Sequence, residues 1–109
     1  MELIKNAEVQ KFYFQDSFQQ TLAGSKQGLK KFEVWRLSLA PGSEVPASRY
    51  AGEVVALTLQ GNGRMVVDGN QVDVRPDTTL VIPPDASRQI SNLGTGELVI
   101  LLIRAVVPA

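Results

Sequence analysis

The chain of 109 residues contains no cysteine and no histidine. The lack of cysteine excludes disulfide bonds and thiol chemistry. The lack of histidine removes the commonest metal ligand and the usual general base, so triads of the Ser-His-Asp type are excluded. The formal net charge is zero, and such a chain has no overall field that would attract nucleic acid or an anionic membrane. We therefore expect neither nucleic acid nor a membrane as a partner.

Long apolar segments are lacking as well. The longest apolar run covers residues 98–103, which is far too short to span a bilayer. Residues 1–6 contain no apolar segment of the kind found in secretory signals. We expect a cytoplasmic protein. Its length predicts one domain, residues 1–109, with a single core.

Short apolar segments separated by turn residues make up most of the sequence after residue 31. Strands are predicted over residues 32–39, 53–60, 64–67, 71–74, 78–82, 88–91 and 98–107. Asp68-Gly69 lies between two of these segments and predicts a hairpin, because glycine supplies the positive φ that tight hairpin turns require. In the first 31 residues, segments 11–14 and 20–23 are the strand candidates. This pattern favours an all-β sandwich or barrel.

Two stretches of glycine, proline and asparagine, residues 42–61 and 77–92, have a characteristic spacing. Together they resemble the two motifs of the cupin family, and the resemblance covers roughly residues 32–107. It implies an all-β fold, a cupin-type jelly-roll β-barrel, in a small single-domain cupin. Asp77 and Asp85 stand where the second motif of the family has glycine.

The resemblance places the four metal-ligand positions of the family on Ser48, Tyr50, Val54 and Arg88. Serine and valine supply no useful ligand, tyrosine is an uncommon one, and arginine is a cation that repels a metal ion. Glu53 is the carboxylate next to these positions, but alternation along a strand directs it to the face opposite Val54. We therefore predict a metal-independent domain with no metal ligands and no cofactor.

Arg88 is the most informative of the four positions. In the register of the motif its guanidinium points into the barrel, where it needs a carboxylate, a carbonyl or a bound anion. Ser48 and Tyr50 would add hydroxyl groups, and Arg36 either lines the same pocket or lies on the solvated face. We predict that Ser48, Tyr50, Arg88 and Arg36 bind a small anionic ligand. The alternative is a structural salt bridge of Arg88 at the rim of a filled barrel.

Three functions fit this pattern. We favour a non-catalytic domain that binds a small molecule or has a regulatory role. The second is a metal-independent isomerase, epimerase or dehydratase acting on a small carboxylated or sugar-type substrate, with Tyr50 and Glu53 as candidate catalytic residues, because a carboxylate must replace the missing histidine base. The third is a structural dimerisation module. An open polar cavity favours binding, a carboxylate beside Tyr50 favours catalysis, and a closed apolar barrel favours the structural role.

Residues 98–103 are apolar at both odd and even positions. A strand with one face in water should alternate between apolar and polar residues, so both faces of this strand must be covered. The barrel interior covers one face. The other is covered either by the N-terminal segment around Phe12, Phe14 and Phe18 or by a second subunit. Small cupins commonly pair sheet against sheet, so the resemblance favours a homodimer.

Overall fold

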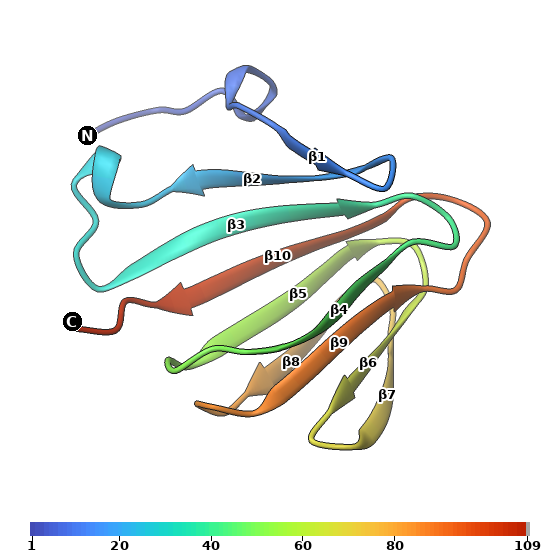
Figure 1. The fold of residues 1–109 in the computed structure, drawn as a ribbon. Helices are drawn as coiled ribbons and strands as arrows, with labels where there is room; N and C mark the ends of the chain where they lie inside the picture. Colours follow the sequence, from blue (N-terminus) through green and yellow to red (C-terminus); the bar gives the residue numbers. More distant parts are fainter. Residues whose placement is uncertain (109) are drawn as a thin grey trace.

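The computed structural model describes residues 1–108, in which two antiparallel sheets face each other (Figure 1). The six-stranded sheet has the order β1-β2-β3-β10-β5-β8, and the four-stranded sheet has the order β4-β9-β6-β7. The strands are β1 (Phe12–Phe14), β2 (Ser17–Ala23), β3 (Phe32–Leu39), β4 (Glu44–Arg49), β5 (Val54–Gln60), β6 (Gly63–Val67), β7 (Asn70–Val74), β8 (Thr78–Ile82), β9 (Ser87–Asn92) and β10 (Leu98–Ala105). The expected all-β jelly roll is confirmed, although the two sheets do not close into a strict barrel.

The strands predicted after residue 31 all form, with boundaries within two residues of the expected ones. The predicted hairpin joins β6 to β7, and its turn residues Asp68 and Gly69 have φ angles of 47° and 81°. The segment before β3 forms the hairpin β1–β2 and two short 3-10 turns, η1 (Asn6–Glu8) and η2 (Ser25–Gln27). Within residues 1–108, no helix is long and apolar enough to cross a membrane.

Strand β4 was not expected from the sequence. Its residues are mostly exposed and include Pro46, which is unfavourable inside a sheet. The structure accommodates the proline because β4 is an edge strand, and its pairing with β9 shifts register between Val45 and Ser48. An irregularity at an edge is where a residue without an N–H costs least. This strand pairs Ser48 with Arg88 on β9, and Tyr50 follows directly after its last residue.

The hydrophobic core lies between the two sheets. Its buried residues are Leu37, Leu39, Val54, Ala56, Met65, Val74, Ile82, Ala86, Ile90, Leu98, Ile100 and Leu102. The odd-numbered residues from Leu37 on β3 and the even-numbered residues from Leu98 on β10 point inward, as alternation in a strand requires. Val54, at the glutamate position of the first motif, is part of this core.

The two aspartates at glycine positions of the second motif keep a glycine-like backbone. Asp77 has a φ of 66° and Asp85 a φ of 62°. Aspartate tolerates the left-handed region better than most side chains do, because its short polar group can hydrogen-bond locally. The motif therefore retains its turn geometry without glycine.

The β1–β2 turn offers a test of backbone strain. Gln15 and Asp16 occupy its two central positions with φ angles of 48° and 59°, where Asn-Gly is the favoured pair. Gln15→Asn/Asp16→Gly is expected to stabilise the protein by about 1 kcal/mol, which raises the melting temperature by about 4–8 °C. Differential scanning calorimetry measures the change. A Gln→Asn change at exposed Gln71 in β7 should give no increase, and an equal increase there would contradict the explanation.

Candidate ligand-binding site

A cavity of about 330 Å³ lies between the sheets, and both sheets contribute to its wall. A volume of this size accommodates a small organic molecule. The lining residues are Phe14, Gln19, Trp35, Leu37, Val45, Ser48, Arg49, Tyr50, Arg88, Ile90, Leu102 and Arg104. Leu37, Ile90 and Leu102 also belong to the hydrophobic core, so one wall of the cavity is the core itself.

Three of the four residues predicted to bind a ligand come together at this cavity. Ser48 and Arg88 are direct partners in the β4–β9 ladder, and Tyr50 follows two residues after Ser48. The structure places Arg36 elsewhere. Its neighbours Trp35 and Leu37 line the cavity, so alternation along β3 directs Arg36 to the outer face of the large sheet.

Arg88 is a buried cation without an acidic partner. Its residue surface is only 9% exposed, and neither of the ion pairs found within residues 1–108 includes it. Burial lowers the pKa of Arg88, the charge of the neighbouring Arg104 lowers it further, and Tyr50 acts in the opposite direction. The guanidinium therefore faces the cavity in an environment that disfavours its own charge.

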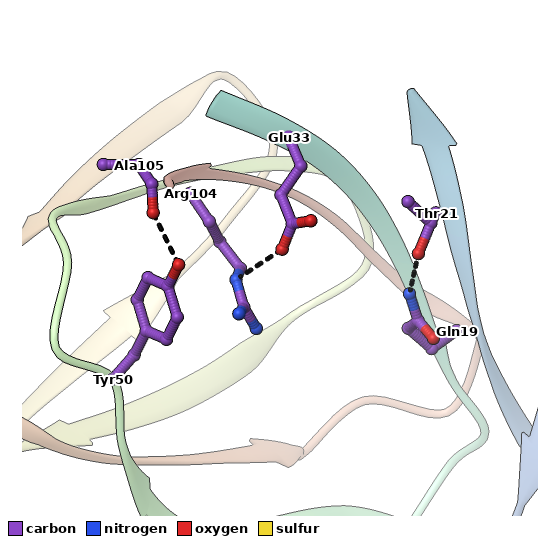
Figure 2. A network of polar contacts seen from close by, with 6 residues as sticks. All are labelled: Gln19, Thr21, Glu33, Tyr50, Arg104 and Ala105. Atoms are coloured by element: carbon purple, nitrogen blue, oxygen red, sulfur yellow. Dashed lines mark hydrogen bonds and ion pairs between the residues drawn. The ribbon is translucent and has the colours of Figure 1, made fainter. Parts of the chain in front are cut away.

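Arg104 is held in a different way. It is the direct cross-strand partner of Glu33, and its Nε lies 3.1 Å from Glu33 Oε1. The N–H is not aligned for a hydrogen bond, so the contact is an ion pair. Figure 2 shows the guanidinium between Glu33 and Tyr50. Its central carbon lies 3.9 Å from the ring centre of Trp35 and 3.8 Å from that of Tyr50, so two aromatic faces stabilise the cation.

The fold and the position of this cavity can be compared with known proteins. Residues 35–104 match the family model described as the cupin domain. The chain belongs to the cupin family. It is 33% identical over 93 residues to auxin-binding protein 1 of Arabidopsis thaliana, covering 76% of this chain and 47% of the relative. It is also 33% identical over 88 residues to auxin-binding protein T85 of Nicotiana tabacum, covering 71% of this chain and 47% of the relative. The chain thus spans about half the length of these curated relatives.

Solved structures support the fold of this cupin but do not select a function. A polyketide cyclase from Streptomyces resistomycificus matches with a TM-score of 0.86 at 15% identity, covering 96% of this chain and 79% of that one. A predicted oxalate decarboxylase from Thermotoga maritima also matches with a TM-score of 0.86, at 17% identity, covering 97% and 100%. The two proteins are named for different chemistries, as expected for a fold that carries many functions.

Sequence reasoning missed Arg104, Glu33 and Trp35 as parts of the site of this cupin. Arg104 continues the inward-facing series of Leu98, Ile100 and Leu102 on β10, so strict alternation could have found it. The apolar residues at both parities of β10 hid that alternation. Trp35 and Glu33 lie on β3, more than 60 residues away along the chain, and the sequence contains no signal for their register with β10.

The candidate catalytic residues do not form an acid–base pair in this structure. The hydroxyl of Tyr50 donates to the backbone oxygen of Ala105 at 2.5 Å (Figure 2). Glu53 is exposed and does not line the cavity, and no aspartate or glutamate does so within residues 1–108. A general base must lie within hydrogen-bond reach of the group that it serves. The arrangement therefore gives Tyr50 no carboxylate partner in the cavity.

The residues described by the structure contain no group of three or more potential metal ligands among Cys, Asp and Glu that could hold an ion. At the four motif positions, Val54 is buried in the core, and Ser48, Tyr50 and Arg88 line the cavity. The place where the family resemblance puts a metal is therefore occupied by two hydroxyl groups and a cation.

Proposed function

We propose that this cupin domain binds a small organic anion in the cavity, in a non-catalytic binding or regulatory role. The observation that carries the proposal is Arg88, a buried guanidinium at the cavity wall with no acidic partner within residues 1–108. An unpaired buried charge is costly, and a bound carboxylate would relieve that cost through a bidentate contact. A purely structural role would be better served by a filled, apolar interior.

The cavity-lining residues other than Arg88 indicate how polar the rest of the ligand is. Besides Tyr50, six apolar or aromatic residues line the cavity, namely Phe14, Trp35, Leu37, Val45, Ile90 and Leu102. Such a surface favours a ligand with an apolar body and one anionic group. The curated relatives carry auxin binding in their names, which supports a ligand-binding role and places auxin among the compounds to test.

Thermal melts with a panel of anions test this function. We expect benzoate, hexanoate or auxin to raise the melting temperature more than chloride at the same ionic strength. Saturation at about 100 times Kd adds roughly 2.7 kcal/mol to the free energy of unfolding. The guanidinium cannot be titrated at working pH, so the effect should persist into alkaline solution. If no organic anion in the panel produced a shift, the proposed function would be wrong.

We also propose that the domain folds without a metal. Its cavity-facing groups at the motif positions are two hydroxyls and a guanidinium, and a cation is repelled by the last of these. Dialysis against EDTA is expected to leave the melting temperature unchanged within about 1 °C, whereas a structural metal would contribute several kcal/mol. Elemental analysis of the dialysed protein is the companion measurement. A stoichiometric transition metal would contradict the expectation.

We further propose a homodimer formed through the outer face of the six-stranded sheet. Register places half-buried or exposed apolar side chains of β5, β8 and β10 together on this face, namely Val55, Leu57, Val81, Leu101 and Ile103. Phe12, Phe14 and Phe18, which were the alternative cover, lie on β1 and β2 within the same sheet and therefore do not lie across β5, β8 and β10. Phe14 lines the cavity and Phe12 is exposed on β1, which extends the same sheet beyond β2 (Figure 1). An isologous contact between two such faces would remove them from water.

Light scattering at micromolar concentration tests the dimer. Val81 is 67% exposed in the single chain, so Val81→Lys should leave the fold intact while placing a charge in the proposed interface. We expect wild type to have the mass of a dimer and Val81→Lys that of a monomer. Val72→Lys, on β7 of the small sheet, is the matched control and should remain dimeric. A monomeric mass for wild type would contradict the proposed dimer through the outer face of the six-stranded sheet.

A further inference from the structure

Three arginines line the cavity, and they differ in what neutralises them. Arg49 is exposed, and its Nη1 donates to the backbone oxygen of Asp85 at 2.7 Å, so solvent screens its charge. Arg104 is paired with Glu33. Arg88 is buried and has no acidic partner within residues 1–108. The shielded charges at the cavity are therefore the guanidinium groups of Arg88 and Arg104, which line its wall, and the carboxylate of Glu33, which lies outside the wall and pairs with Arg104.

The Glu33–Arg104 pair is held firmly in place. The side chains of Arg104 and Glu33 are only 15% and 25% exposed. The guanidinium is stacked between the rings of Trp35 and Tyr50, and the hydroxyl of Tyr50 is itself bound to Ala105 (Figure 2). The two aromatic rings and the carboxylate thus fix the position of Arg104 in the cavity wall, where Glu33 compensates its charge.

We infer that the Glu33–Arg104 ion pair determines ligand specificity by limiting the site to a single negative charge, so that the ligand is a monocarboxylate with an apolar body. This inference rests on the proposed anion-binding function. One carboxylate on Arg88 leaves the shielded region neutral. A second carboxylate on the ligand would face a largely apolar part of the cavity wall. Arg104, the other shielded cation there, is already paired with Glu33. A buried charge without a partner binds poorly.

The same argument makes Glu33 the residue that rejects dianions. Without its carboxylate, Arg104 would present an uncompensated positive charge beside Arg88. Charge interactions in a partly buried site are several times stronger than in bulk water. A ligand with two anionic groups could then satisfy both arginines. The selectivity between monoanions and dianions should therefore depend on Glu33, which lies on β3 beside the cavity.

Isothermal titration calorimetry with matched pairs of acids tests the inference. The probes are butyrate with succinate, pentanoate with glutarate, and hexanoate with adipate, so that the length of the ligand does not decide the result. Wild type is expected to bind the best monocarboxylate at least about tenfold more tightly than its dicarboxylate partner, which corresponds to about 1.4 kcal/mol. Glu33→Gln should shift that ratio by about tenfold toward the dicarboxylate.

The matched control is Glu53→Gln, which makes the same charge change at an exposed side chain outside the cavity. It should leave the ratio as in wild type. Glu33→Gln/Arg104→Gln removes both charges and should restore the preference for monocarboxylates, and melting curves of each variant show that it is folded. If Glu33→Gln alone is unstable, the wild-type ratio still tests the inference, because a wild type that bound dicarboxylates as tightly as monocarboxylates would overturn it.

The possible failures are distinguishable. If wild type bound monocarboxylates and Glu33→Gln left the ratio unchanged, the inference about the ion pair would be wrong and the proposed function would stand. Tighter binding of dicarboxylates by wild type would also overturn it. If wild type bound none of the probes, the proposed anion-binding function would fail, and the specificity argument would fail with it.

Discussion

Arg88→Met is expected to abolish anion binding while leaving the protein folded and at least as stable as wild type. A carboxylate bound by Arg88 would lose a buried, charge-assisted contact, and such losses cost about 2–5 kcal/mol, or at least about 30-fold in affinity. The ligand-induced rise in melting temperature should therefore disappear. Methionine is unbranched and uncharged, so it keeps an apolar side chain at this place in the cavity wall.

The effect of Arg88→Met on the free protein has a defined sign. Burial, followed by the charge of Arg104, lowers the pKa of Arg88 in the folded state. A cation whose folded pKa lies below its unfolded value destabilises the folded state wherever the unfolded group is protonated, which for arginine includes all neutral and moderately alkaline pH. Removing the charge should raise the melting temperature. If Arg88 instead formed a structural salt bridge, the same change would lower it.

Arg64→Met is the matched control. Arg64 forms a surface ion pair with Asp73 at 3.4 Å, and the two side chains are 41% and 57% exposed. Such pairs contribute little, so this variant should stay within about 0.5 kcal/mol of wild type and keep the full ligand-induced shift. Calorimetric melts with and without hexanoate measure both properties. A ligand-induced shift that survived in Arg88→Met would remove Arg88 from the site.

Gly61→Ala is expected to destabilise the protein by at least about 3 kcal/mol, a large part of the stability of a small domain. Gly61 has a φ of +87°, a conformation that costs an L-residue about 1–2 kcal/mol. A Cβ here would also overlap the carbonyl oxygen of Glu97 and lie 2.9 Å from Cα of Leu98. These are backbone atoms next to a fully buried core residue, so they cannot move without disturbing the core.

Gly69→Ala separates the two causes. Gly69 in the β6–β7 turn has nearly the same φ, +81°, but nothing lies within 4 Å of the position of its Cβ. Its alanine variant should lose only the conformational part, about 1 kcal/mol. Urea unfolding of the three proteins gives the free energies directly. Equal losses for the two variants would show that the contact with residues 97–98 contributes nothing.

Part of the candidate site was predictable from the sequence, and part was not. The register of the two motifs predicted Ser48, Tyr50 and Arg88 at the site, because each motif indicates which of its residues face inward. Neither motif predicts the ion pair between Glu33 and Arg104. It depends on the pairing of β3 with β10, which sets residues 71 positions apart directly opposite each other. Arg36 was predicted to bind the ligand because of its charge. Alternation on β3 instead directs its side chain away from the cavity.

The sequence by itself determined the strands after residue 31, the Asp68-Gly69 hairpin and membership of the cupin family. These features depend on local alternation, on turn residues and on short motifs, all of which act over a few neighbouring residues. Only the tertiary structure decided that a cavity remains between the sheets, that Arg104 is neutralised there and that Arg88 is not. The burial and pairing of these charges depend on residues from six strands that line one cavity. No local sequence pattern predicts which of these residues will be in contact.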